Sequence, residues 1–238
     1  MKKYLTLICL AIALIPSVAM AQAITEEDKD WARLAYYQEK NAEVKTKPLA
    51  VLFGDSITRN WVREDASWLD ERNFVGRGIG GQTTMQLLVR FRQDVIELDP
   101  EYVVILAGIN DIARNNGYIT VENTFRNLVS MVELAKFNGI KPVMCTLVAA
   151  DEIGWRKRIG DPRPQIEELN ALIRDYAESH KIPLADYHTA TKAEDGGMIQ
   201  EYRKDAVHPD IDGYKAMEKV LDGVFYKLLS KKKYPFNR

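Results

Sequence analysis

Cysteine and histidine are scarce in this sequence, and neither sign of charge dominates. The 238 residues include two cysteines, three histidines, and 33 basic against 34 acidic side chains. This balance gives no electrostatic reason to expect a nucleic-acid partner, because such proteins cluster Lys and Arg on one face. Cys9 lies in an N-terminal segment that we expect to be removed, which leaves Cys145 alone in the apolar stretch "PVMCTLV". We therefore expect no disulfide within the mature chain and a buried Cys145.

An apolar run long enough to span a bilayer is also missing. The N-terminus has two lysines, then apolar residues from about position 5 to 15, then Ala19-Met20-Ala21. This order is typical of a cleaved secretory signal, and an uncleaved anchor is the alternative. We expect residues 1–21 to be a signal peptide and the protein to be periplasmic or secreted, with no stable membrane insertion.

Linkers, repeats and low-complexity tracts are absent as well, so we expect residues 22–238 to form a single domain. Apolar runs alternate with segments of helical period. The predicted strands lie in 48–54, 72–78, 101–108, 140–148 and 182–187, and the predicted helices span 25–44, 84–98, 121–139, 165–180 and 213–229. Strands without polar alternation are buried on both faces, so the pattern predicts a three-layer α/β/α sandwich around a parallel sheet.

Two of the predicted helices carry specific expectations. Helix 25–44 is expected to begin with a capping-box-like pair, Thr25 and Asp28. Helix 84–98 has Leu88, Phe91, Val95 and Leu98 at gaps of three and four, so these four are expected to face the core.

Polar stretches follow the ends of the predicted strands. "GDSIT", "GIGGQTT", "AGINDIA" and "ADYHTATK" come after the first, second, third and fifth, and "KDAVHPD" precedes the last helix. In open parallel sheets the carboxyl ends of the strands meet at one edge, where ligands bind. The sequence therefore predicts one site built from these loops.

Ser56, at the end of the first strand, is a candidate nucleophile if a base lies beside it. His180 sits near a helix end, where a solvated role is expected, and His188 is the weaker candidate base. His208 follows Asp205 by three residues, a spacing that allows a carboxylate to orient the imidazole. The alternatives for this Asp-x-x-His pair are a surface turn or a metal site, although no third ligand stands at a suitable spacing.

An acyl-transfer site also needs donors for the oxyanion of the tetrahedral intermediate. Gly80-Gly81 precedes a predicted helix, so backbone N–H groups there are available to a closely approaching substrate. Asn110, after the third strand, carries an amide donor. A glycine turn and an Asn-Asp loop are the structural alternatives, and the shared position at one sheet edge favours function.

Four short blocks, in order and properly spaced, resemble those of the SGNH or GDSL-type esterase and acylhydrolase family. They are "FGDSIT", "RGIGGQTT", "LAGIND" and "DAVHP", and the match covers nearly all of the expected mature chain. The resemblance implies a flavodoxin-like sandwich with a five-stranded parallel sheet. It also implies an ester hydrolase that works without a metal or other cofactor.

Carried over position by position, the resemblance assigns the nucleophile to Ser56, the general base to His208 and the orienting acid to Asp205. The oxyanion donors would be the backbone N–H groups of Ser56 and Gly81 and the side chain of Asn110. Two positions depart from the family pattern: many relatives have threonine where this chain has Ile109, and asparagine where it has Gly76.

The substrate is less constrained than the chemistry. Compact members resemble secreted acetylesterases acting on decorated carbohydrates, so short-chain, acetyl esters on glycans are the leading expectation. Periplasmic thioesterases or lysophospholipases on longer acyl chains are the alternative, and a non-catalytic carbohydrate- or lipid-binding protein is a further one.

The segment "DEIGWRKRIGDPRP" is the expected rim of the acyl pocket. Trp155 is expected to stack on a sugar, and Arg156 or Arg158 to meet an anionic group. Asp55 is a further candidate substrate contact. The basic tail "SKKKYPFNR" is expected to be solvated, with contact to a membrane surface as the alternative.

Overall fold

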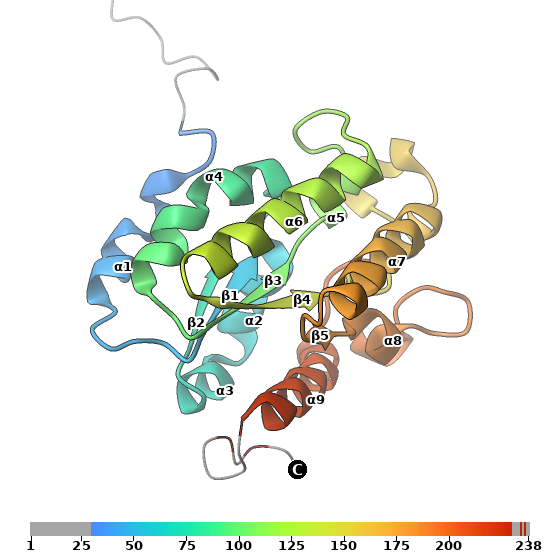
Figure 1. The fold of residues 1–238 in the computed structure, drawn as a ribbon. Helices are drawn as coiled ribbons and strands as arrows, with labels where there is room; N and C mark the ends of the chain where they lie inside the picture. The colour runs from blue at the N-terminus through green and yellow to red at the C-terminus, as the bar shows by residue number, and fades with distance from the viewer. Residues whose placement is uncertain (1–29, 230–233, 235, 237–238) are drawn as a thin grey trace, which may run out of the picture.

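A computed structural model describes residues 30–229, 234 and 236, and in them a five-stranded parallel sheet lies between two layers of helices (Figure 1). The strand order is β2-β1-β3-β4-β5, with every neighbouring pair parallel. The predicted three-layer sandwich is therefore confirmed. The expected signal peptide, residues 1–21, and most of the basic tail lie outside the described residues.

The strands are short and sit close to the predicted runs. Their bounds are β1 Ala50–Gly54, β2 Phe74–Gly78, β3 Tyr102–Leu106, β4 Lys141–Cys145 and β5 Leu184–Ala185. All five residues of β1 and all five of β3 are buried. Because these central strands are covered on both faces, their sequences show no polar alternation.

Helices cover both faces of the sheet (Figure 1). One layer holds α4 Thr84–Asp94, α6 Val121–Phe137 and α7 Arg163–Ser179, and the other holds α2 Ser56–Glu64, α3 Ala66–Glu71 and α9 Ile211–Leu228. The shorter helices are α1 Gln38–Glu43, α5 Ile109–Ile112 and α8 Tyr187–Thr191. No helix in the described ranges is both long and apolar enough to cross a membrane.

The predicted helix over 25–44 is wrong as a continuous element. Residues 25–29 lie outside the described part of the chain, and Arg33 has a left-handed backbone with φ 55°. A helix cannot continue through that conformation. Instead, Asp30 accepts a hydrogen bond from the Ala35 N–H at 3.0 Å, and a short 3₁₀ turn, Leu34–Tyr37, leads into α1.

The prediction for the core-facing residues of helix 84–98 is confirmed at three of its four positions, because Phe91, Val95 and Leu98 are buried. Leu88 is only partly buried, whereas Leu87, Arg90, Phe91 and Asp94 are buried. The Arg90 guanidinium donates to the Asp94 carboxylate at 2.9 Å, and both side chains are fully enclosed. A pattern of apolar periodicity cannot place a charged pair in the core, so the burial of Arg90 and Asp94 was not predicted.

An aromatic cluster fixes α2, the helix that follows β1. The Trp61 ring lies 5.2 Å from Trp68 on α3 and 5.6 Å from Tyr214 on α9, both in stacked arrangements. The Tyr214 hydroxyl donates to the Ile57 carbonyl at 2.9 Å. Because these contacts join α2 to both neighbouring helices, they hold the start of α2, where Ser56 lies.

Candidate functional site

Ser56 is the first residue of α2 and follows β1 after a single residue. Asp55 caps the helix by accepting from the Ile57 N–H at 3.0 Å. A Cβ at Gly54 would lie 2.3 Å from the Leu106 carbonyl oxygen, so only glycine permits β3 to pack this close at the turn. The strand therefore delivers Ser56 to the carboxyl edge of the sheet in a rigid setting.

Ser56, His208 and Asp205 form one chain of hydrogen bonds. The Ser56 Oγ lies 2.9 Å from His208 Nε2, and His208 Nδ1 lies 2.8 Å from Asp205 Oδ2. An ionised carboxylate can only accept, so Nδ1 carries the proton and Nε2 is free to accept from the serine hydroxyl. This tautomer is the one that a general base needs.

A tight turn holds the acid and the histidine together. Asp205 Oδ1 accepts from the backbone N–H groups of Val207 and His208, both at 2.8 Å. Burial alone would raise the pKa of Asp205, but these two hydrogen bonds and the one from the His208 ring outweigh it and lower the pKa. Arg203, just before the turn, pairs with Asp151 at 3.2 Å and ties it to the segment that carries Trp155.

The other two histidines lie elsewhere. His188 is buried on α8, with its Nε2 3.7 Å from Glu167 on α7, and burial lowers its pKa. His180 stacks on Tyr176 at 3.9 Å near the end of α7. The loop after the fifth strand therefore does not supply the partner of Ser56, and the structure brings only His208 to it.

Two backbone N–H groups at the site are free to donate to an anion. Neither the Ser56 N–H nor the Gly81 N–H has a hydrogen-bond acceptor among the described residues. Ser56 is at a helix start, where N–H groups lack intrahelical partners. Gly81 has φ +80°, a conformation that side chains rarely adopt, and with its neighbours it lines the same cavity as Ser56.

Asn110 reaches this place too, but its amide is occupied. It donates to the Asp55 carboxylate at 3.2 Å and to the Gln82 carbonyl at 3.0 Å. Its oxygen accepts from Asn115 at 2.8 Å. A role as an oxyanion donor therefore requires Asn110 to share a hydrogen that now supports the loop, which the sequence could not indicate.

Two buried carboxylates lie behind the site. Burial raises the pKa of Asp55 to about 6, despite the hydrogen bond from the Ile57 N–H and the nearby His208 and Arg90. Burial likewise raises the pKa of Asp111 to about 6, against hydrogen bonds from Thr84. The Thr84 hydroxyl donates to Asp111 at 2.6 Å, so this carboxylate fixes the start of α4 beneath Gly81.

A cavity of about 320 Å³ opens over Ser56. The residues that line it are Ser56, Arg59, Gly80, Gly81, Asn110, Asn115, Trp155 and His208. The Trp155 ring lies 5.9 Å from the His208 ring, and its Nε1 donates to Asn115 at 3.0 Å. The expected rim residue Trp155 is therefore at the mouth.

Three expected substrate contacts do not line this cavity. Asp55 is 1% exposed and lies beneath the helix start, where its carboxylate is used for capping and for holding Asn110. Arg156 and Arg158 lie on the 3₁₀ segment Gly154–Ile159 but are not among the lining residues. The Arg156 Nε is buried without a partner in the described ranges, so it faces protein and not the cavity.

Arg59 and Asn115 line the Ser56 cavity but were not predicted from the sequence to be site residues. Arg59 stands three residues after Ser56, about one turn further along α2. Had this helix been predicted, the spacing would have placed Arg59 on the same helix face as Ser56. Asn115 follows Asn110 by five residues and has no comparable signal. Its contacts to Gly81, Asn110 and Trp155 join three loops at the mouth.

The two departures from the family pattern fit their surroundings. At Gly76 a Cβ would lie 2.1 Å from Val62 Cγ2, so α2 packs where a side chain would otherwise stand. Ile109 is 2% exposed at the start of α5 and belongs to the core. Within the described part of the chain, no group of three His, Cys, Asp or Glu residues is arranged to hold a metal ion.

Comparison with known proteins agrees with this geometry. A model of the GDSL-like lipase/acylhydrolase family matches residues 52–216. The chain belongs to this family. As a GDSL-like acylhydrolase it is a carboxylic ester hydrolase, and the expected family and class of enzyme are confirmed.

Solved structures and a curated sequence resemble this GDSL-like acylhydrolase closely. An inferred acylhydrolase of Bacteroides fragilis is 44% identical, with a TM-score of 0.81 over 84% of this chain and 99% of that one. A GDSL-like lipase of Bacteroides thetaiotaomicron is 40% identical, with a TM-score of 0.80 over 83% and 99%. An uncharacterised lipoprotein of Bacillus subtilis, YqeF, is 29% identical over 63% of this chain and 75% of its own length.

Proposed function

We propose that this acylhydrolase is a serine esterase that removes short acyl groups, acetyl above all, from carbohydrate esters. The observation that carries the proposal is the hydrogen-bonded chain from Ser56 through His208 to Asp205 at the floor of a small cavity. A nucleophile, a base and an orienting carboxylate in this order are the requirements of double-displacement ester hydrolysis.

In the proposed mechanism, Ser56 Oγ attacks the ester carbonyl while His208 Nε2 takes the hydroxyl proton. The tetrahedral intermediate collapses, His208 gives that proton to the leaving alcohol, and an acyl-serine remains. Water, deprotonated by His208, then attacks the acyl-serine, and the carboxylic acid and free Ser56 are released. Asp205 stabilises the imidazolium that forms in each half of the cycle.

The oxyanion would be held by N–H groups that are already in position. The open N–H groups of Ser56 and Gly81 supply two donors, and Asn110 supplies a third by sharing an amide hydrogen with Asp55 or Gln82. Each preorganised donor typically contributes about 3–4 kcal/mol to transition-state stabilisation. This is the largest electrostatic contribution that we assign to the site.

The lining of the cavity supports a short acyl group. Of the described residues that line it, none has an aliphatic side chain; glycines, amides, Arg59, Trp155 and the Ser-His pair form the walls. A long acyl chain needs an apolar trough to repay its removal from water, at about 0.8 kcal/mol for each CH₂. An acetyl group needs none, and the exposed Trp155 ring is available to a sugar.

We further propose that residues 22–238 act as one catalytic domain outside the cytoplasm, with a small-molecule or glycan ester as partner. The match over 52–216 supports one domain. The signal-like N-terminus and a curated relative that is a lipoprotein support export.

The test is hydrolysis of p-nitrophenyl acetate, butyrate and octanoate by the full mature chain and by Ser56→Ala. The proposal expects the highest kcat/KM on acetate and its loss, by about 10³-fold or more, in the variant. Ser179→Ala removes an exposed serine at the end of α7 and is the matched control, expected to keep full activity. Activity that survives Ser56→Ala would overturn the mechanism, and a preference for octanoate would overturn the short-chain assignment.

A further inference from the structure

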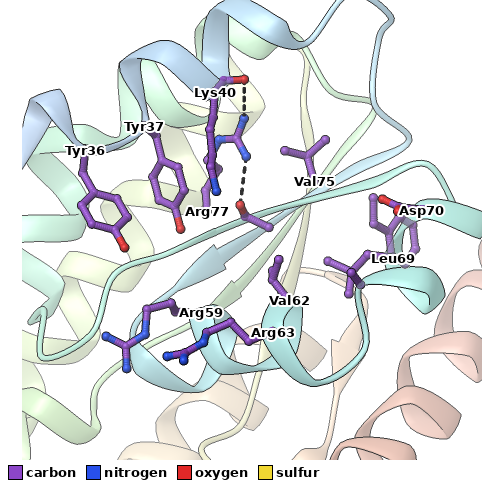
Figure 2. Close-up of a pocket in the computed structure, with 13 residues that line it drawn as sticks. Tyr36, Tyr37, Lys40, Arg59, Val62, Arg63, Leu69, Asp70, Val75 and Arg77 are labelled. Atoms are coloured by element: carbon purple, nitrogen blue, oxygen red, sulfur yellow. Dashed lines mark hydrogen bonds between the residues drawn. The ribbon is translucent and has the colours of Figure 1, made fainter.

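A second cavity, of about 480 Å³, lies along the outer edge of the sheet. Its walls come from the chain around α1, from α2 and α3, and from the edge strand β2. Figure 2 shows Tyr36, Tyr37 and Lys40 projecting from one side toward Arg59 and Arg63 on α2. The cavity is open to solvent at the exposed side chains of Tyr36, Lys40 and Arg63.

Positive charge dominates this edge cavity. Lys40, Arg59, Arg63 and Arg77 line it, against one acidic residue, Asp70. None of the four cations forms an ion pair with a carboxylate of the described residues. Arg77 is held by the Asn41 side-chain oxygen at 2.6 Å and by two carbonyls, and Arg59 by the Asn60 amide oxygen. Arg77 is 5% exposed and its guanidinium nitrogens are engaged, so the cations available to an anion are Lys40, Arg59 and Arg63.

Arg59 joins the edge cavity to the Ser56 cavity, because it lines both. Its guanidinium lies against Gly80, where an added Cβ would be 2.2 Å from Nη1. Ser56, Arg59 and Arg63 are spaced i, i+3 and i+7, so they share one face of α2. At 1.5 Å per residue, Arg63 stands ~10 Å along the helix axis from the nucleophile, about the length of a disaccharide.

We propose that the edge cavity binds the carboxylate-bearing sugars of an acidic oligosaccharide. The esterified sugar of the same oligosaccharide would lie in the Ser56 cavity. The inference rests on the proposed function and names the substrate class more narrowly: esters of uronate-containing glycans. Arg59 and Arg63 present planar guanidinium groups suited to bidentate carboxylate binding. Tyr36, 46% exposed, offers a ring face to a sugar.

The lining favours a sugar over a lipid. The largest apolar side chains of the edge cavity, Leu69 and Phe74, are 2% and 4% exposed and form its floor. Polar and charged groups form the rim. The accessible aliphatic side chains are short ones, Val62, Ala66 and Val75, which give a long acyl chain no continuous trough, whereas a polyhydroxylated, negatively charged chain finds cations on both walls.

The test is equilibrium binding by calorimetry, in the Ser56→Ala background so that no turnover occurs. The probes are tetragalacturonate and the neutral galactotetraose. We expect the acidic probe to bind at least about tenfold more tightly, and Arg63→Ala to weaken it by about tenfold. Arg63 is exposed, and its side chain forms no hydrogen bond or ion pair with the described residues, so its loss leaves the core intact. Arg92→Ala, an exposed arginine on α4 away from both cavities, is the matched control and should bind as the parent does.

Three outcomes would overturn the inference: equal binding of the two sugars, no effect of Arg63→Ala, or an equal effect of Arg92→Ala. Co-sedimentation with phosphatidylglycerol vesicles that is lost in Arg63→Ala, without sugar binding, would assign the cavity to an anionic lipid instead. Hydrolysis of p-nitrophenyl acetate tests the proposed function separately. Ser56-dependent hydrolysis without selective sugar binding refutes only the edge cavity, whereas sugar binding without hydrolysis refutes only the esterase.

Discussion

The side chain of Asn110, from the loop after β3, donates to the carboxylate of Asp55, from the loop after β1, at 3.2 Å. The same amide donates to the Gln82 carbonyl, so three loops at the carboxyl edge of the sheet meet at one side chain. Asn110 therefore has two roles open to it: support of the loops and, in the proposed mechanism, stabilisation of the oxyanion.

Replacement of Asn110 separates these roles. We expect Asn110→Ala to lower kcat on p-nitrophenyl acetate by about 10²-fold or more, because an oxyanion donor is lost. The same change leaves the buried Asp55 carboxylate short of a donor, so the free energy of unfolding should fall by about 1–3 kcal/mol. Steady-state kinetics and urea unfolding measure the two effects. A variant that is destabilised but retains kcat would leave Asn110 with the supporting role alone.

Asp205 is expected to matter for catalysis more than for folding. Asp205→Asn keeps a hydrogen-bonding group of the same size but removes the charge that selects the His208 tautomer, so kcat should fall by about 10³–10⁴-fold. The comparison is with Asp212→Asn, an exposed aspartate in the first turn of α9, which should keep its activity. Similar kcat values for the two variants would remove Asp205 from the mechanism.

We expect the buried Asp111 carboxyl group to make the free energy of unfolding depend on pH. Its folded pKa is about 6, above its ordinary value of 3.8, so it holds a proton in the folded protein that the unfolded chain has released between those pH values. The stability it contributes is complete below about pH 4 and is lost as pH rises through about 6.

The matched variant is Asp111→Asn, which is neutral and can still bond to Thr84. The unfolding free energy of the parent, minus that of the variant, should fall as pH rises from about 4 to about 6, by at most ~1.4 kcal/mol per pH unit. Urea unfolding across that range measures it. A flat difference, or one that rises with pH, would contradict the raised pKa.

The buried Arg90–Asp94 pair predicts a large single-site effect on stability. Arg90→Met leaves the Asp94 carboxylate enclosed without its cation, so the unfolding free energy should fall by about 3–5 kcal/mol. Arg90→Met combined with Asp94→Leu should recover much of this, because no unpaired charge remains. Arg92→Ala, on the exposed face of α4, should change stability by less than about 0.5 kcal/mol. A double variant no more stable than Arg90→Met would show that the other bonds of Arg90 matter more than the pair.

Much of the fold could be predicted because the central strands are apolar on both faces. β1 and β3 carry no polar alternation, and that feature alone indicates a parallel sheet between helices. The short helices α2 and α3 were not predicted. α2 carries charged and polar residues beside buried Ile57 and Trp61, and tertiary contacts of Trp61 hold it.

The residues of the candidate site could also be predicted only in part. Ser56, His208 and Asp205 were predicted from two short motifs, one that follows the first strand and one that precedes the last helix, and the structure places the three side chains within hydrogen-bond distance. Arg156 and Asp55 were expected to touch substrate, but which way a side chain points from an irregular loop depends on packing that no motif records. Asn115 shows the same limit, since its contacts to Gly81 and Trp155 come from segments distant in the chain.

Side chains cover part of the outer edge of β2, the edge strand of the sheet. The Asn73 carbonyl accepts from the Leu49 N–H, and the Ile79 N–H donates to the Gly54 carbonyl. Alternate residues along this strand therefore bond to β1, and the carbonyls of Gly76 and Gly78 face outward. The Tyr37 hydroxyl donates to the Gly78 carbonyl at 2.5 Å, and the Arg77 guanidinium to the Gly76 carbonyl at 2.9 Å. An uncovered edge of this kind invites a strand from a neighbouring molecule. These two carbonyls are therefore not open to a strand of a neighbouring molecule, and the side chains that engage them, Tyr37 and Arg77, also line the edge cavity.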